Sequence, residues 1–206
     1  MKRKKKGTIF IIIGILLIVA ALSIVIYNKL DSDRAERAAK DVLGKLTDVI
    51  AENAKNQDTE EARNEEAFRK SRNIMAGSMI DGYEYIGEII IPAADISLPV
   101  MSEWDMTRLD ISPCRYTGTI YNNDLVICGH NHKHFSAIRY LDIGADVFFI
   151  TINGEEIHYK VENLETVGPT EVEKMIDNVT GWDLTLFTCN ISGATRCAVR
   201  CVRVED

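Results

Sequence analysis

The pattern of hydrophobic and polar positions begins with one long apolar run. From Ile9 to Tyr27 nearly every residue is apolar, and about 20 such residues are enough to cross a bilayer as a helix. A cleaved signal peptide has a shorter apolar stretch followed by a small-residue cleavage site, whereas this run leads into YNKLDSDR. We therefore predict a basic tail over residues 1–7 and an uncleaved transmembrane anchor over residues 8–28.

A different periodicity follows the anchor. Apolar residues recur there at three- and four-residue steps, at Ala35, Ala38, Val42, Leu46 and Val49. This spacing predicts an amphipathic helix, which fades after Ala51 into a polar, highly charged stretch with little apolar face to bury. We predict a helical, charged stalk over residues 29–80, acting mainly as a spacer between the membrane and a folded domain.

Residues 81–206 have the patterns of short strands. β-Branched and aromatic runs occur in YEYIGEIIIPAADISLPV, DLVICG, WDLTLFTC and TRCAVRCVRV, and the Asn153-Gly154 pair predicts a hairpin between the β runs on either side of it. Short helices are expected within SEWDMTRLD, HFSAIRYLDIG and PTEVEKMID. Many short strands with few helices predict a mainly β domain, a closed or nearly closed β-barrel.

The distribution of charge indicates how the chain is oriented in the membrane and argues against nucleic acid as a partner. Five basic residues precede the apolar run (Lys2, Arg3, Lys4, Lys5 and Lys6), and such flanks stay in the cytoplasm. We therefore expect a single-pass membrane protein whose domain lies outside the cell. The chain has a net charge of −7, so the outer part is acidic, and the lack of a basic stripe argues against nucleic acid as a partner.

The chain has five cysteines, an odd count that leaves at least one thiol unpaired within the chain. Cys197 and Cys201 cannot bond to each other on one strand, because four residues of strand span about 13 Å. We expect these two, together with Cys114 and Cys128, to be buried thiols. Cys189 differs from them because it ends an apolar run just before a turn.

Three residue types suggest acyl-transfer chemistry. Cys189 ends one predicted strand, His130 follows another, and Arg196 begins the last. If the NISGA segment makes a hairpin, Arg196 returns beside Cys189. A thiolate is a nucleophile favoured by a neighbouring cation, a histidine can move the protons of the amines, and an arginine can stabilise an oxyanion.

Two other readings of these residues stay open. His130, His132 and His134 alternate, so in an extended segment they would share one side, and imidazoles bind zinc. A metal-dependent hydrolase is therefore possible, although no acidic or cysteine ligand follows at a recognisable spacing. The other alternative is a membrane-anchored binding module without catalysis.

The block from Tyr85 to the C-terminus resembles the sortases, the membrane-anchored cysteine transpeptidases of Gram-positive bacteria. The segment TLFTC at 185–189 matches the family's TLxTC signature, VICGHN at 126–131 matches its histidine segment, and RCAV at 196–199 matches its arginine segment. IGEIIIPAADISLPV and YLDIGADVFF resemble other strands of the family. The likeness covers about 120 residues and keeps the three segments in the family's order.

The resemblance implies a catalytic set of His130, Cys189 and Arg196, with Arg200 as the alternative arginine. It implies that Cys189 attacks a sorting signal of the LPxTG type and that an amine of a cell-wall precursor or pilin resolves the thioacyl enzyme, without a cofactor or metal. Substrate contacts are expected from Thr188, Val167 and Pro169. His132 and His134 are not part of this set, and we expect them at the surface or groove rim.

Overall fold

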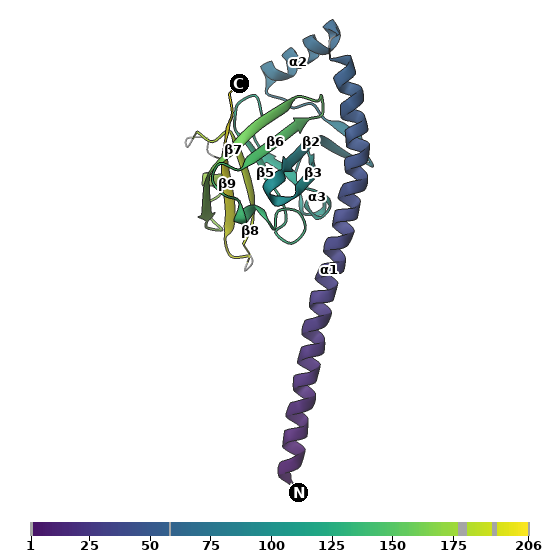
Figure 1. Cartoon of the computed structure of the whole chain (residues 1–206), viewed down its shortest axis with the longest axis vertical. Coiled ribbons are helices and arrows are strands. Elements are labelled where there is room, and N and C mark those ends of the chain that lie inside the picture. Colours follow the sequence, from purple (N-terminus) through teal and green to yellow (C-terminus); the bar gives the residue numbers. More distant parts are fainter. Residues whose placement is uncertain (1, 58, 177–180, 191–192, 206) are drawn as a thin grey trace. The chain divides into compact units, whose positions relative to one another are not determined.

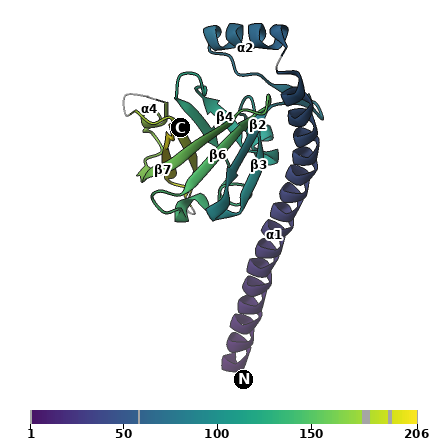
Figure 2. The ribbon, with the colours of Figure 1, turned by 45° about the horizontal axis from the view of Figure 1, so that its top comes forward.

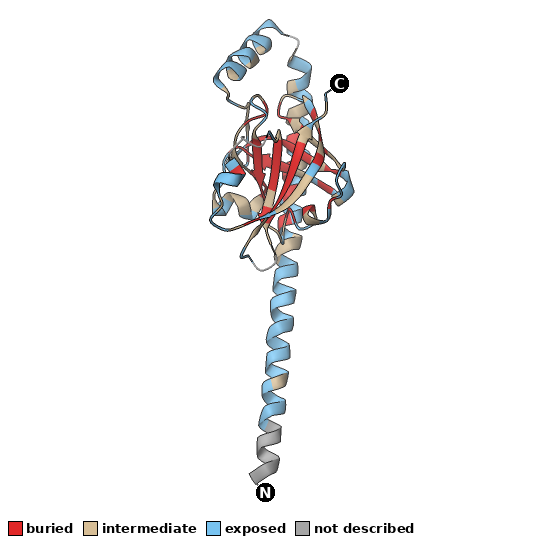
Figure 3. Ribbon diagram, turned by 90° about the vertical axis from the view of Figure 1, so that its left-hand side faces the viewer, coloured by how far each residue is buried: buried red, intermediate tan, exposed pale blue. Residues whose placement is uncertain are grey.

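The computed structural model of the chain describes residues 2–57, 59–176, 181–190 and 193–205. It separates into two compact units, residues 1–34 and 35–206. Helix α1 (Lys2–Asn56) forms the first unit and begins the second. Its large apolar side chains between Ile9 and Tyr27 are exposed (Figure 3), and this helix is long and apolar enough to cross a membrane.

The second unit is built on a β-barrel (Figures 1 and 2). Its strands, in hydrogen-bonded order, are β2 (Tyr83–Ile91), β3 (Ile96–Met101), β4 (Cys114–Thr117), β5 (Leu125–Cys128), β8 (Leu184–Cys189), β9 (Arg196–Arg203), β7 (Glu156–Val167) and β6 (Asp146–Thr151). Strand β6 pairs back onto β2 and closes the ring, while β1 (Ser78–Ile80) adds to β2 outside it. The predicted closed, mainly β fold is therefore confirmed.

Short helices fill the connections. They are α2 (Glu60–Arg72), η1 (Pro92–Ala94), α3 (Met106–Ile111), η2 (Ile138–Tyr140) and α4 (Glu173–Ile176). Asp105 caps α3, because its carboxylate accepts the backbone N–H of Arg108 at 2.8 Å. Helices α3 and α4 lie where the sequence predicted helices, whereas HFSAIRYLDIG forms only the 3₁₀ turn η2.

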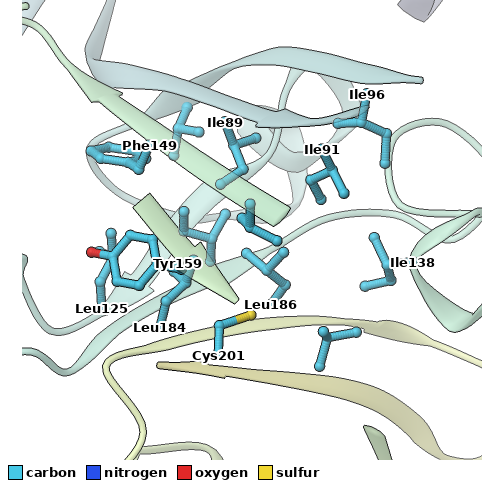
Figure 4. Close-up of a cluster of buried hydrophobic side chains, with 14 of the residues drawn as sticks. Ile89, Ile91, Ile96, Leu125, Ile138, Phe149, Tyr159, Leu184, Leu186 and Cys201 are labelled. Carbon is cyan, nitrogen blue, oxygen red and sulfur yellow. The ribbon is translucent and has the colours of Figure 1, made fainter. Parts of the chain in front are cut away.

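The barrel interior is apolar, and Figure 4 shows its centre. Strand β6 alternates between buried and half-buried positions, as expected for a strand with one face on the core. Strand β5 is buried along its whole length, because it has a second apolar cluster on its other face. The first cluster contains Leu125 and Ile127, and the second contains Cys128.

The second half of α1 covers this outer cluster. Its residues Val42 and Leu46 are buried against Tyr85, Met101 and the thiols of Cys114 and Cys128. Residues 35–56 thus belong to the folded unit, although we expected residues 29–80 to be a spacer. The predicted apolar stripe is wrong at one position. Ala38, which we expected in the stripe, is exposed, and the neighbouring Ala39 is buried.

The β6–β7 hairpin packs against the end of the same helix. Asn53 and Gln57 donate side-chain hydrogen bonds to the carbonyls of Ile152 and Asn153. Gly154 has a φ of +85°, and a Cβ there would lie 3.0 Å from the Cβ of Ala54. The Asn-Gly turn that predicted the hairpin is therefore also a second point where the helix touches the barrel.

Candidate active site

Two parallel neighbouring strands bring His130 and Cys189 to one edge of the barrel. Strand β5 pairs in parallel with β8, with Cys128 opposite Phe187. The carboxyl ends of parallel neighbours meet at the same edge. His130 lies two residues beyond the end of β5, and Cys189 is the last residue of β8.

Hydrogen bonds on both sides of these residues fix the two segments to each other. On one side, the hydroxyl of Thr188 donates to the carbonyl of Gly129 at 2.7 Å. On the other side, the amide of Asn131 donates to the carbonyl of Asn190 at 3.1 Å. The residues flanking His130 are therefore bonded to the residues flanking Cys189. Gly129 is required here because a Cβ would lie 2.7 Å from the ring of Phe135.

Arg196 lies directly across from Cys189. The two residues are register partners in the antiparallel pair β8–β9, and Val167 is the partner of Arg196 on its other side. The ends of the connecting loop are held together, because Asn190 bonds to Thr195 through its backbone N–H and its side chain. The Arg196 guanidinium is half-buried and donates through Nη1 to loop carbonyls of Gly193 and Thr195.

Arg200 has a different environment four residues further along β9. It is only 3% exposed, its Nη2 lies 2.6 Å from Glu165 Oε1, and its Nη1 donates to the hydroxyl of Thr185 at 2.9 Å. A further hydrogen bond reaches the carbonyl of Lys174 in α4. Arg200 therefore holds α4 against the barrel, and it does not line the groove described next.

A groove of about 310 Å³ connects these residues. It is lined by all six residues that the sequence pointed to, namely His130, Val167, Pro169, Thr188, Cys189 and Arg196. Among its other lining residues, an apolar wall comes from β4, β8, the first residue of α3 and the loop before it: Trp104, Met106, Tyr116 and Phe187. The rings of Trp104 and Tyr116 have centroids 5.1 Å apart, and that of Phe187 meets Tyr116 edge-on at 5.2 Å.

The side chain of Thr188 contacts the backbone just before His130. The sequence suggested that it touches substrate or stabilises an oxyanion, but it is only 1% exposed and its hydroxyl donates to Gly129. A hydroxyl has one proton to donate, so in this conformation it is not available to an oxyanion. Thr188 thus joins the Cys189 strand to the His130 loop.

Burial separates Cys189 from the other thiols, as expected. Cys114, Cys128, Cys197 and Cys201 are buried and free, whereas Cys189 is half-exposed. Desolvation raises the pKa of Cys128 and of Cys201 to about 12, and it raises the pKa of the other two buried thiols as well. These four stay protonated at neutral pH, which makes them poor nucleophiles.

His130 is largely buried and has charged neighbours. Its Nε2 lies 3.3 Å from Oδ1 of Asp110 in α3, and the same oxygen lies 3.1 Å from Nζ of Lys133. Desolvation lowers the pKa of His130, His132 and Lys133 lower it further, and Asp110 raises it. The net effect favours a neutral imidazole at neutral pH, which can accept a proton.

The three histidines do not lie along an extended segment, which was the basis of the metal-site interpretation. The segment is a turn, since the backbone N–H groups of His134 and Phe135 both donate to the carbonyl of His130. His132 is exposed, with its ring 5.2 Å from that of His130. Among the described residues, no group of three or more His, Cys, Asp or Glu side chains is arranged to hold a metal ion.

The expectation that His134 lies at the surface or groove rim is wrong. It is only 4% exposed, and neither ring nitrogen has a hydrogen-bond partner in the part of the chain that the structure describes. Desolvation lowers its pKa to about 4, with His130 adding to the shift and the backbone of Ile111 opposing it. The turn at His130 redirects this side chain inward, which an alternating pattern does not reveal.

Comparison with known proteins identifies the family of the chain. A family model described as the sortase domain matches residues 89–204. Sortase C of Streptococcus pneumoniae superimposes with a TM-score of 0.64 at 21% identity, over 81% of this chain and 97% of that one. Sortase A from Corynebacterium diphtheriae gives 0.58 at 19% identity, over 82% and 96%.

A Clostridium perfringens sortase D5 transpeptidase superimposes with a TM-score of 0.60 at 15% identity, over 82% of this chain and 99% of that one. A search of curated proteins finds no significant sequence match. The structural similarities establish the shared fold, and the family model covers more than half of the chain. The chain therefore belongs to the sortase family of cysteine transpeptidases.

Proposed function

We propose that this sortase uses Cys189, His130 and Arg196 to cleave an LPxTG-like sorting signal and transfer the exported protein to an amine of a cell-wall precursor or pilin. The observation that carries this proposal is that the residues on both sides of His130 are hydrogen-bonded to the residues on both sides of Cys189. The hydrogen bonds Gly129–Thr188 and Asn131–Asn190 hold the histidine and cysteine segments together. Arg196 completes the set as the register partner of Cys189.

The reaction follows from these positions. His130 accepts the thiol proton of Cys189, and the resulting thiolate attacks the scissile carbonyl carbon. The oxyanion that forms interacts with the Arg196 guanidinium. His130 gives a proton to the leaving amine as the C–N bond breaks, which leaves a thioester on Cys189. The incoming amine then attacks the thioester, loses a proton to His130 and forms the new amide as the C–S bond breaks.

The groove supplies the binding surface for the apolar residues of the signal. Trp104, Tyr116 and Phe187 form one wall. The groove is also lined by Val167 and Pro169, as the sequence suggested, together with Met175 of α4. A mostly apolar cleft with a few polar groups at one end is typical of sites that bind a peptide with an apolar stretch.

The anchor and its flanking charges support a location outside the cell for this reaction. One N-terminal helix can cross a membrane, and the five basic residues before it favour a cytoplasmic N-terminus. The catalytic domain would then lie outside the cell, where exported proteins and their acceptors meet. A reporter fused to either end of the chain tests this orientation.

The activity itself is tested with the full chain in detergent and a library of fluorogenic sorting-type peptides, with and without an amine acceptor. We expect cleavage that requires Cys189, together with a ligated product when the amine is present. Cleavage that continues unchanged in Cys189→Ala would contradict the proposal. Cleavage without any ligated product, at high amine concentration, would replace transfer by hydrolysis at the same residues.

A further inference from the structure

A charged group next to the site is not part of the proposed catalytic set. Asp110 lies in α3, 20 residues before His130 in the sequence, and its Oδ1 is within 3.3 Å of His130 Nε2 and 3.1 Å of Lys133 Nζ. Lys133 follows His130 in the same turn, and its side chain is only 8% exposed. One carboxylate oxygen thus contacts both the histidine and a nearly buried lysine.

We propose that Asp110 is a positioning residue for His130 and that Lys133 limits how strongly it acts. This inference rests on the proposed function, because it assigns His130 the proton transfer. With Oδ1 of Asp110 at 3.3 Å, the proton of the neutral ring is favoured on Nε2. This fixes the ring orientation and leaves Nδ1 as the nitrogen that exchanges protons with the thiol and the reacting amines. Lys133 shares the carboxylate and so weakens its pull on the imidazolium.

The surroundings of His130 offer few competing charges. From its own turn it meets Lys133 and the rings of His132 and His134, and α3 contributes Asp110. The other ionisable side chains along the groove, besides Tyr116 and Cys128, are Glu171, Cys189 and Arg196. Among the described residues, Asp110 is the one carboxylate within ion-pair distance of the His130 imidazole.

This arrangement predicts opposite effects of two substitutions. Asp110→Asn removes the negative charge that favours the imidazolium, so the pKa of His130 should fall by roughly half a unit to one unit. Lys133→Met removes a repelling cation and releases the carboxylate, so the same pKa should rise by a similar amount. Asp110→Glu should restore most of the wild-type value.

The test is an NMR titration of the full chain in detergent micelles with isotopically labelled histidine. The chain has four histidines, and His130→Gln assigns the relevant signal. Glu103→Gln is the matched control, since it removes one exposed carboxylate just before α3 and should leave the pKa of His130 unchanged. Shifts in the same direction for both variants, or no shift in either, would overturn the proposal.

A second readout separates positioning from a merely structural contact. The acid limb of kcat/KM should move with the NMR pKa, to lower pH in Asp110→Asn and to higher pH in Lys133→Met. A limb that stays in place while the NMR pKa moves would contradict the positioning role. Because the titration needs no substrate, it decides whether the pair exists even if cleavage proves independent of Cys189.

Discussion

Strand β9 carries two arginines on the same face, four residues apart, and the barrel uses them differently. Arg200 faces Thr185 in the interior of the β8–β9 pair, and Arg196 faces Cys189 at its edge. We call Arg200 and Thr185 the interior pair, and Arg196 and Cys189 the edge pair. Arg200 is bound to Glu165 and to the carbonyl of Lys174, whereas Arg196 contacts the carbonyls of its own loop and opens onto the groove.

The difference shows how position along one strand separates stability from chemistry. An arginine deep in the sheet needs a carboxylate and hydrogen-bond acceptors, because an unpaired buried charge is costly. An arginine at the edge is partly hydrated, and it is near enough to Cys189 to meet charge that forms on a substrate. The interior pair should therefore control folding, and the edge pair should control turnover.

The largest effect should come from removing the thiol of the edge pair. We expect Cys189→Ala to lower kcat/KM by at least about 10⁴-fold, because no other group on the chain forms the thioester. Peptide cleavage by the full chain is the measurement. Cys197→Ala removes a buried thiol beside Thr188 and should remain active; equal losses in both variants would contradict the edge assignment.

The interior pair should respond in stability. Arg200→Gln leaves Glu165 and the Lys174 carbonyl without their cation, so we expect the free energy of unfolding to fall by about 2–4 kcal/mol. Urea denaturation of the full chain in detergent measures it. Arg203→Gln is the control, since its contact with Glu155 is long (3.7 Å) and partly exposed, and it should change stability by less than about 0.5 kcal/mol.

Replacing Arg196, the edge arginine, should lower turnover and leave stability nearly unchanged. Arg196→Gln should lower kcat/KM by about 10²- to 10³-fold, the range seen when one oxyanion donor is removed. Its unfolding free energy should stay near that of the wild type, because the guanidinium is half-exposed. A loss of stability matching that of Arg200→Gln, with turnover preserved, would break the distinction between the two pairs.

The smallest effect concerns the turn that carries His130. Unfolded His134 binds a proton below about pH 6.5, whereas the folded residue stays neutral until about pH 4. The unfolded state thus holds more protons between these values, so stability should fall as the pH falls, by about 1.5 kcal/mol from pH 6.5 to 5.

Thermal unfolding across this pH range, with His134→Leu beside the wild type, measures the contribution. The leucine variant should lose most of the acid dependence and keep its stability at pH 7, since neither ring nitrogen has a hydrogen-bond partner among the described residues. The same acid dependence in both proteins would mean that His134 is not the group responsible. It would leave the comparison of the two arginines unaffected.

The sequence predicted the edge pair because its parts are local. Strand ends, a short hairpin loop and the order of His130, Cys189 and Arg196 are all visible in one chain without three-dimensional information. The same patterns could not decide between Arg196 and Arg200. That choice depends on register, which places Cys189 opposite the first and Thr185 opposite the second.

The features that the sequence did not predict depend on contacts between segments that are distant in the chain. Asp110 reaches His130 only because α3 packs beside the turn, and nothing in DMTRLDI indicates that contact. The apolar wall of Trp104, Tyr116 and Phe187 likewise combines two strands and the loop before α3. The charged composition of residues 29–80 suggested a spacer, yet a few small and apolar residues are enough to pack the end of α1 onto the barrel.

Trapping the acyl enzyme tests the central claim most directly. The full chain would be quenched with acid shortly after mixing with a cleaved peptide, and the adduct located by mass spectrometry in the wild type, Arg196→Gln and Arg200→Gln. We expect a thioester on Cys189 in all three proteins, forming at least about 10²-fold more slowly in Arg196→Gln and at near wild-type rate in folded Arg200→Gln. An adduct on another residue, or slow formation in Arg200→Gln alone, would contradict it.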